Sequence, residues 1–409
     1  MNKKIAIIIE RANITLGGAE RSVFELANAI SKLGPEVDIL AATGSPPLVS
    51  HRRTKNIHIL CTNSFGKRTC YFTFAKALRE HLAKNHYDVI HSVLPFDFAD
   101  IYQPRGGTYA ESVLRNAASY QNKFIESYKK LTAFANFRRT ILLRAEKKLC
   151  KQPNGPIIIA ISQYVAKQFK RHYAAGDDRI VVIPNGIKTY RKIDTSKADR
   201  LRSQILNQLG QETRDEPAFF LFVANNFRLK GLAVLIKAMQ LAANQGTPRP
   251  GFLIVVGNDR EHKYRRLANK LNIHKKTIFL GPIRYIQDVL SISDVAVLPT
   301  FYDPCSRYIL EALAAYKPVI TTSFNGATDL FVNNRHGKVI DSPEDVPALA
   351  EAISYFTNTE NIRKASQAIA ADNLKEKISI SRVAKQLINV YESTLQKKDQ
   401  ERLTKPKMG

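Results

Sequence analysis

Residues 218–231 read AFFLFVANNFRLKG, and this stretch determines the fold class of the chain. Its first seven residues, Ala218 to Ala224, are apolar at every position. A short, continuous apolar run of this kind is typical of a parallel strand that is buried on both faces. A polar and basic loop follows and leads into a helical pattern. A buried strand that passes through a loop into a helix is the repeating unit of α/β proteins.

The same unit recurs on both sides of this stretch. Similar runs are FLIVVG, TIFLG, VAVLP and PVITT in the second half, and IAIII, VDILAAT, IHIL, DVIHSV, IIIAIS and IVVIP in the first. Helical patterns such as AERSVFELANAISKLG separate them, the latter ending at Gly34 and Pro35. With 409 residues, the chain has room for two domains of about 200 residues each. We therefore predict two doubly wound, Rossmann-like α/β domains.

The domain boundary is predicted at the Pro184-Asn185-Gly186 turn, which follows the run IVVIP. We assign residues 1–186 to a first Rossmann-like domain and residues 187–378 to a second. Residues 379–409 are expected to form a helix, roughly Ser379 to Gln396, and a polar tail.

Residues 115–151 interrupt the α/β alternation, because they contain no strand pattern and predict a pair of helices. Aromatic residues recur there every three or four positions beside a dense set of basic residues, which is typical of a helix on anionic lipid. An amphipathic helix packed on its own domain, with a solvated basic face, is the alternative. The candidates for membrane contact are Lys123, Phe124, Lys129, Lys130, Phe134, Arg138 and Arg139.

The net charge of +26 favours an anionic partner, such as an anionic lipid surface, a phosphorylated substrate or a nucleic acid, although a basic solvated surface without a specific partner would give the same value. The four cysteines are scattered without metal-site spacing, which favours a reducing, cytoplasmic compartment. The run Ile5 to Ile9 is too short for a signal peptide and predicts a first buried strand. No apolar stretch approaches the roughly 20 residues that span a bilayer.

Ligands of doubly wound sheets bind beyond the carboxyl ends of the strands, so the loops that lead into helices are the candidate sites. In the first loop, Gly17 and Gly18 allow close approach of a phosphate to a helix N-terminus, although a plain tight turn would look the same. In the second, Arg228 and Lys230 can clamp a pyrophosphate, the alternative being a solvated basic loop.

The third loop spans residues 300–313, where Ser306 is a suitable N-cap for the following helix. Asp303 precedes that helix and Glu311 lies on its second turn, so the two carboxylates can contact different parts of one nucleotide sugar. Asp303 would meet the sugar hydroxyls and Glu311 the ribose hydroxyls. A turn residue before Pro304 and a surface ion pair are the respective alternatives.

Together, the stretches GGAERSVFELANAI, IPNGI, FRLKGL and YDPCSRYILEALAAYKPVITT resemble the retaining glycosyltransferase family 4, which has the GT-B architecture. Within that family, LFVANNFRLKG, FLIVVGNDREHKY and VLPTFYDPCS are most similar to the lipopolysaccharide core glucosyltransferases. The resemblance covers about Ile5 to Asp341 and is denser in the second domain. It implies an active site in the cleft between two Rossmann-like domains, of which residues 1–186 would form the acceptor-side domain and residues 187–378 the domain that binds the nucleotide sugar.

The resemblance also implies roles for single residues. Gly17 and Gly18 would lie beside the donor phosphates, Arg228 and Lys230 would bind the pyrophosphate, and Glu311 would hold the ribose. Asp303 would contact the transferred sugar. Backbone N–H groups of Cys305, Ser306 and Arg307 would assist with phosphate and sugar, and the loop at Gly281 would flank the base. The segment 115–151 matches a membrane-associating insertion of the core glucosyltransferases in place and character.

Two positions depart from the family pattern. Asp303 stands where the family usually has glutamate, so the sugar contact or the identity of the sugar can differ. Arg105 stands nearest to a histidine that many relatives carry in the first domain. An arginine can orient a sugar or a phosphate, but it stays protonated and cannot act as a base.

The implied activity is retaining transfer of a hexose or heptose from a nucleotide-diphosphate sugar to a membrane-associated glycolipid or polysaccharide, with lipopolysaccharide core as one candidate. No metal and no cofactor beyond the donor are expected, and the chain contains no Asp-x-Asp triplet. The expected location is the cytoplasmic face of the inner membrane. Three alternatives remain: an inactive family member that acts as a membrane-surface scaffold, a nucleotide-sugar epimerase, and a nucleic-acid-binding protein, the last without any of the usual modules.

Overall fold

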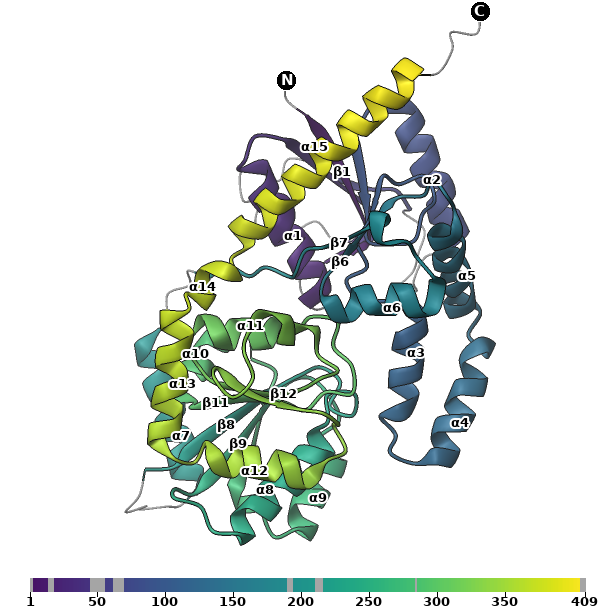
Figure 1. Ribbon diagram of the computed structural model, residues 1–409. Helices are drawn as coiled ribbons and strands as arrows, with labels where there is room; N and C mark the ends of the chain where they lie inside the picture. Colours follow the sequence, from purple (N-terminus) through teal and green to yellow (C-terminus); the bar gives the residue numbers. More distant parts are fainter. Residues whose placement is uncertain are drawn as a thin grey trace, which may run out of the picture. The chain divides into compact units, whose positions relative to one another are not determined.

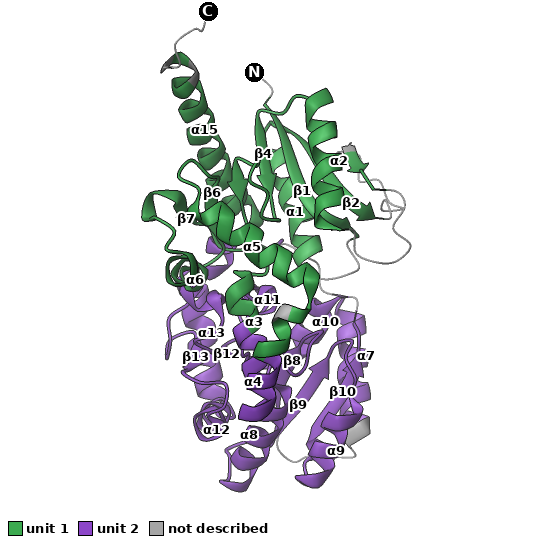
Figure 2. Cartoon of the chain, turned by 90° about the vertical axis from the view of Figure 1, so that its right-hand side faces the viewer, with its two compact units in different colours: residues 1–113, 130–187, 379–409 green, residues 114–129, 188–378 purple. Residues whose placement is uncertain are grey.

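The computed structural model describes residues 3–13, 18–44, 56–61, 70–189, 194–209, 216–283 and 285–404. The chain divides into two compact units (Figure 2). Unit 1 consists of Met1–Val113, Lys130–Ile187 and Ser379–Gly409, and unit 2 consists of Leu114–Lys129 and Lys188–Ile378. The C-terminal segment is thus part of the same unit as the N-terminus.

Unit 1 contains a parallel sheet in the order β3-β2-β1-β4-β5-β6-β7. Its strands β1, β6 and β7 are labelled in Figure 1. Its strands are β1 (Lys4–Ala12), β2 (Glu36–Gly44), β3 (Asn56–Ile59), β4 (Val89–Ser92), β5 (Ile101–Tyr102), β6 (Ile157–Ala160) and β7 (Ile180–Val182). Strand β1 explains the continuous apolar run at the N-terminus. Ile5, Ile7 and Ile9 belong to one hydrophobic core, and Ala6 and Ile8 belong to another on the opposite face. Both faces of the strand are therefore buried.

Helices cover both faces of this sheet. One core includes residues of α1 (Gly18–Ser31) and α15 (Ile380–Thr404), and the other includes residues of α2 (Tyr71–Lys84) and Leu142 of α5 (Phe137–Lys151). Helix α6 (Gln163–Tyr173) completes the unit. Helix α15 is fixed by a polar contact as well, since its Tyr391 hydroxyl lies 2.7 Å from Nδ1 of the buried His91.

Unit 2 contains a second parallel sheet in the order β10-β9-β8-β11-β12-β13. Its strands are β8 (Ala218–Val223), β9 (Gly251–Val256), β10 (Thr277–Gly281), β11 (Val295–Leu298), β12 (Val319–Thr322) and β13 (Gly337–Ile340). Its helices are α7 (Thr195–Leu209), α8 (Leu232–Asn244), α9 (His262–Lys270), α10 (Ile286–Ile292), α11 (Arg307–Ala314), α12 (Val346–Tyr355), α13 (Thr359–Ala371) and α14 (Leu374–Lys377). Two parallel sheets flanked by helices confirm the predicted fold class.

The segment 115–151 is helical, as predicted. It contains the end of α3 (Tyr109–Ala118), then α4 (Lys123–Thr132), the short 3-10 helix η1 (Ala133–Ala135) and α5. Helix α15 extends beyond the predicted range of Ser379 to Gln396. Strands β5 and β13 were not predicted, because β5 has two residues and β13 contains only two strongly apolar ones.

A buried carboxylate connects three elements of unit 1. Glu146 of α5 is fully buried, and it accepts hydrogen bonds from the Tyr102 hydroxyl at 2.7 Å, the Tyr173 hydroxyl at 2.5 Å and the Tyr109 backbone N–H at 2.8 Å. Burial nevertheless raises the pKa of Glu146 to about 7, because it penalises the charged form more than the three donors stabilise it.

We expect this carboxyl to make unit 1 less stable as the pH rises. From an unfolded pKa of about 4.5 up to the folded pKa of about 7, the unfolded chain releases a proton that the folded chain keeps, so stability falls across this window. Relative to Glu146→Gln, the wild type should lose about 3 kcal/mol between pH 4.5 and 7.5. Urea unfolding at both pH values measures this, and parallel pH profiles of the two proteins would contradict it.

A glycine of unit 2 provides a second test. Gly231 precedes α8 with φ +80°, and a Cβ there would overlap the carbonyl oxygen of Pro299. Gly246 has nearly the same φ, +77°, but open space around it. Gly246→Ala should therefore cost only the backbone strain of about 1–2 kcal/mol, and Gly231→Ala several kcal/mol in total. Equal losses in denaturant unfolding would show that the overlap is relieved at no cost.

Candidate functional site

The predicted donor loops of unit 2 lie at the switch point of its sheet. Strand β8 has β9 on one side and β11 on the other, and the chain builds outward from β8 in both directions. The loops that follow β8 and β11 therefore emerge side by side at the carboxyl edge, where doubly wound sheets bind ligands. They are joined by the backbone, since Phe301 N donates to Leu229 O at 2.9 Å.

Lys230 and Asp303, predicted from separate loops, are in direct contact. Lys230 Nζ donates to Asp303 Oδ2 at 2.8 Å and to the Tyr302 carbonyl oxygen at 2.7 Å. Their side chains are 19% and 16% exposed, so the pair is partly shielded from water yet still reachable. A ligand at this position would meet an ammonium and a carboxylate together, and not a lone cation.

Helix α11 begins at Arg307 after the N-cap Ser306, whose side chain accepts from Ile309 N, as predicted. Two of the backbone N–H groups expected to assist with phosphate already have acceptors. Cys305 N donates to Asp303 Oδ1 at 3.3 Å, and Ser306 N donates to Asn325 Oδ1 at 3.2 Å. The fully buried Asn325 also accepts from Ala327 N and donates to Thr321 Oγ1, so it fixes the start of the helix. No sequence pattern indicated this role of Asn325.

Glu311 is mostly buried on α11. Its Oε1 lies 3.9 Å from Nη2 of Arg307, one helical turn earlier, and both side chains are 12% exposed. At this exposure the pair differs from a solvated surface ion pair, because each group has lost most of its water. Arg307 and Glu311 are thus held next to the loop that carries Asp303.

Arg228 is held by residues of the last turn of α3 and of the segment that follows it. Its guanidinium contacts Asn116 and Ser119, and it lies 3.8 Å from the centroid of the Tyr120 ring. All four residues belong to unit 2. No sequence pattern indicated this contact, which joins positions more than 100 residues apart.

Of the predicted glycines Gly17, Gly18 and Gly281, the structure describes Gly18 and Gly281. Gly17 lies outside the described residues, and Gly18 is the exposed first residue of α1, directly beyond the carboxyl end of β1. Gly281 ends β10 with φ +68°, accepts a hydrogen bond from Gly257 N at 3.0 Å and would leave open space around a Cβ. An open position at a strand end is compatible with the predicted place beside a base.

Arg105 is anchored within unit 1. Its Nη1 donates to Asn185 Oδ1 at 2.9 Å, which connects the predicted catalytic position to the Pro184-Asn185-Gly186 turn. His91, which no sequence pattern singled out, is fully buried nearby. Burial, with a smaller contribution from the charge of Arg105, lowers the pKa of His91 to about 3, so this ring is neutral at physiological pH. It contacts Tyr391 and is too deeply buried to touch a ligand.

Three of the seven predicted membrane residues, Lys123, Phe124 and Lys129, are exposed. No residue of α4 is buried, and Phe124 is 89% exposed. Lys123 and Lys129 are also exposed, whereas Lys130 and Arg139 are half-buried. Arg138 is half-buried and pairs with Glu10 at 2.5 Å, so it is not a free surface cation, and the side chain of Phe134 lies outside the described residues. Among the described helices, none has the length and apolar character needed to cross a bilayer.

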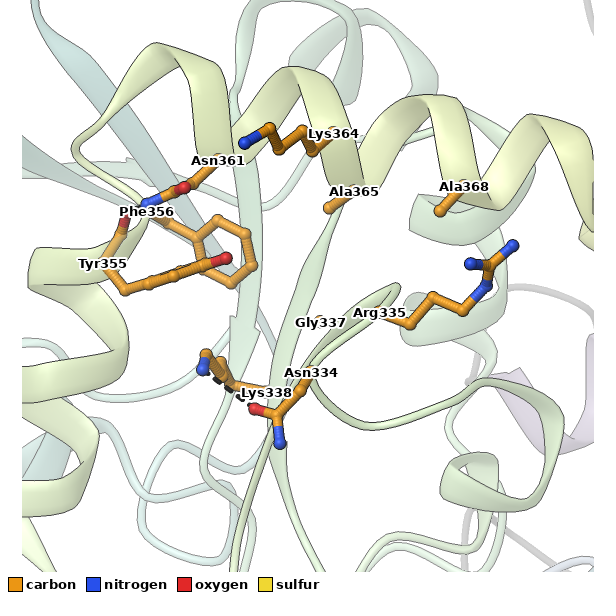
Figure 3. Close-up of a pocket in the computed structure, with 10 residues that line it drawn as sticks. All are labelled: Asn334, Arg335, Gly337, Lys338, Tyr355, Phe356, Asn361, Lys364, Ala365 and Ala368. Atoms are coloured by element: carbon orange, nitrogen blue, oxygen red, sulfur yellow. Dashed lines mark hydrogen bonds between the residues drawn. The ribbon is translucent and has the colours of Figure 1, made fainter.

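A separate cavity of about 320 Å³ lies in unit 2, where residues 334–338 face α12 and α13 (Figure 3). Its three cations already have partners. Arg335 pairs with Asp372 at 2.7 Å, Lys338 lies 4.3 Å from the Tyr355 ring centroid, and Lys364 is 3.7 Å from Glu360. None of the predicted site residues lines this cavity. In the described part of the chain, no cluster of His, Cys, Asp and Glu could hold a metal ion.

Comparisons with known proteins agree with this organisation. The family model described as Glycosyltransferase Family 4 matches residues 16–191, and the model described as Glycosyl transferases group 1 matches residues 207–372. The chain is 20% identical to the lipopolysaccharide glucosyltransferase WaaG of Escherichia coli (strain K12) over 349 residues, which are 85% of this chain and 88% of WaaG.

Two crystal structures share the fold. That of WaaG, a glycosyltransferase involved in lipopolysaccharide biosynthesis, has a TM-score of 0.73 at 18% identity and covers 95% of this chain and 99% of WaaG. That of Anabaena Alr3699/HepE in complex with UDP-glucose has a TM-score of 0.68 at 17% identity, with coverage of 95% and 99%. The chain is therefore a glycosyltransferase of the GT-B fold, with a glycosyltransferase family 4 domain followed by a group 1 domain.

Proposed function

We propose that the protein transfers a hexose or heptose, with retention of configuration, from a nucleotide-diphosphate sugar to a glycolipid or polysaccharide acceptor at a membrane surface. The observation that supports this most strongly is the group formed by Arg228, Lys230, Asp303 and the start of α11 at the switch point of unit 2. WaaG is a lipopolysaccharide glucosyltransferase and HepE binds UDP-glucose, which makes a nucleotide sugar the expected donor and lipopolysaccharide core a candidate acceptor.

The chemical task of this site is to stabilise a leaving pyrophosphate. When the bond between the sugar and the diphosphate loosens, negative charge develops on the departing oxygen and a positive, oxocarbenium-like centre develops on the sugar. Arg228, Lys230 and the positive end of the α11 dipole would stabilise the departing charge, by several kcal/mol together. In this proposal the donor is the only small molecule required besides the acceptor.

The contact between Lys230 and Asp303 gives each group a second role. Asp303 holds the ammonium in place before the donor arrives, so less rotamer entropy is lost when the phosphate binds. Its second oxygen accepts from Cys305 N, which fixes the carboxylate in the loop that would face the sugar hydroxyls. Carboxylate oxygens accept hydrogen bonds from hydroxyls, as this position requires.

Glu311 would bind the ribose hydroxyls of the donor. It lies on the second turn of α11, so it reaches a different part of the nucleotide from Asp303. Arg307 would orient Glu311, because the two side chains are mostly buried and 3.9 Å apart. Arg105, whose guanidinium is fixed by Asn185, would orient the sugar or an acceptor phosphate.

Membrane association is proposed through α4 and the start of α5. Exposed aromatic and apolar side chains lie there beside lysines and arginines, a composition typical of helices that lie in the headgroup region. Phe124 and Leu131 are 89% and 75% exposed. Large apolar side chains that are exposed together on one segment indicate a surface that binds a membrane or a partner. The proposed location is the cytoplasmic face of the inner membrane.

We expect a nucleoside diphosphate to stabilise the protein against heat. A ligand at 100 times its Kd stabilises the folded state by about 2.7 kcal/mol. Thermal shifts should be measured with UDP, ADP and GDP and with their monophosphates. One diphosphate should give the largest shift, Lys230→Ala should weaken its binding about tenfold or more, and Glu311→Ala should also reduce it.

Lys270→Ala is the matched control, because it removes an exposed lysine of α9 in the same unit. It should leave the shift unchanged. No shift from any nucleotide, with the protein shown to be folded, would contradict the transferase proposal and favour the scaffold alternative.

Binding to anionic vesicles tests the membrane surface. Each lysine near an anionic lipid surface contributes about 1 kcal/mol, so replacing Lys123, Lys129 and Lys130 with alanine should weaken binding to phosphatidylglycerol vesicles about a hundredfold. Replacing Lys263, Arg266 and Lys270 of α9 removes the same charge and should have a much smaller effect. Equal losses in vesicle sedimentation would mean that net charge, and not α4, determines binding.

A further inference from the structure

Arg228 is held by the turn between α3 and α4 through several contacts. Its Nη1 donates to the Asn116 carbonyl oxygen at 2.9 Å and to the Ser119 hydroxyl, and its Nη2 donates to Asn116 Oδ1 at 3.3 Å. The Tyr120 ring lies against the guanidinium, with its centroid 3.8 Å from Cζ. A planar cation is thus hydrogen-bonded at its end and stacked on one face.

The partners of Arg228 are electrostatically suited to a cation. Helix α3 ends at Ala118, so the Asn116 carbonyl belongs to the last turn, where helical carbonyls lack intrahelical partners and carry the negative end of the dipole. Ser119 is ordered in turn, because its hydroxyl donates to the same Asn116 oxygen at 2.7 Å. The turn therefore presents oxygen acceptors and an aromatic face to Arg228.

These contacts leave one side of the guanidinium available. Three of its five N–H groups donate to Asn116 and Ser119. The Nε–H and the second Nη2–H have no acceptor among the described residues. Nε and Nη2 form a fork that matches two oxygens of one phosphate. These contacts thus restrain the Arg228 side chain and leave two of its N–H groups able to donate to an anion.

A second contact joins the same turn to the site. The Arg115 guanidinium lies 3.9 Å from the centroid of the Phe324 ring. The Phe324 carbonyl oxygen accepts from Asp303 N at 2.9 Å, and the next residue is Asn325, which fixes the start of α11. The end of α3 therefore contacts the site both at Arg228 and beside Asp303, although the site residues lie more than 100 positions later in the chain.

We propose that Asn116, Ser119 and Tyr120 are positioning residues for donor binding, which orient the guanidinium of Arg228 toward the donor pyrophosphate. This inference rests on the proposed function, because it requires that Arg228 bind the diphosphate. Without these contacts, an arginine side chain must lose rotamer freedom when the phosphate binds, which weakens the complex. The effect should appear in diphosphate binding and should disappear when Arg228 is absent.

The test uses the full chain and measures Kd by calorimetry for UDP, ADP, GDP and their monophosphates. Arg228→Ala should weaken binding of the preferred diphosphate most. Tyr120→Ala should weaken it about tenfold, Ser119→Ala somewhat less, and both should change monophosphate binding by less than about threefold. Tyr120→Phe keeps the aromatic ring that lies against the guanidinium, so its affinity for the diphosphate should equal that of the wild type.

A double-mutant cycle separates positioning from general stability. In the Arg228→Ala background, Tyr120→Ala should have no further effect on diphosphate affinity, because its influence passes through Arg228. Tyr355→Ala is the matched control, since it removes another tyrosine of unit 2 that lies under a cation, Lys338. It should leave diphosphate affinity unchanged. Equal losses for mono- and diphosphate, or additive losses in the double variant, would overturn the inference.

The outcomes also separate this inference from the proposed function. If Arg228→Ala weakens diphosphate binding while Tyr120→Ala and Ser119→Ala stay within twofold of wild type, the positioning role is wrong and the function stands. If Arg228→Ala itself binds diphosphate as tightly as wild type, the pyrophosphate role of Arg228 is wrong, and the positioning role falls with it. Ser119→Ala deletes one oxygen, so it keeps the test decisive if Tyr120→Ala does not fold.

Discussion

The burial of β8 on both faces is the constraint on which the rest of unit 2 depends. A strand with apolar neighbours above and below has no place for polar chemistry along its length, since its backbone groups are satisfied only by the adjacent strands. Charged side chains can therefore appear only where the strand ends. Because β11 lies next to β8, the loop after β8 lies beside the loop after β11. Lys230 from the first loop and Asp303 from the second are in contact there.

Each cation of the site is held by a negatively charged or partially negative group. Lys230 has Asp303, Arg307 has Glu311, and Arg228 has a helix carbonyl and an aromatic ring. Unpaired cations within one site would repel one another and destabilise the protein when no donor is bound. These partners keep the cations ordered. A pyrophosphate carries more negative charge than any of them, so it can share or replace these contacts when it binds.

The sequence predicted features that depend on neighbouring residues and missed those that depend on distant ones. Continuous apolar runs predicted all strands except β5 and β13, and strand ends located the loops of Arg228 and Asp303. The segment 115–151 was correctly predicted to be helical. The roles of Asn325, His91 and the Asn116–Tyr120 turn carry no local pattern, because each depends on a partner brought close only by folding. An asparagine that fixes a helix start from another loop looks like any other asparagine in sequence.

The path of the chain has a consequence for dissecting this protein. Unit 1 is assembled from three separate stretches of sequence, and its last stretch, α15, supplies Val383, Leu387 and Tyr391 to the core around β1. No single cleavage point releases unit 1 intact, and a fragment that stops near residue 187 would expose the apolar surface that α15 covers. To produce unit 1 without residues 188–378, α15 would therefore have to be joined through a linker to residue 187.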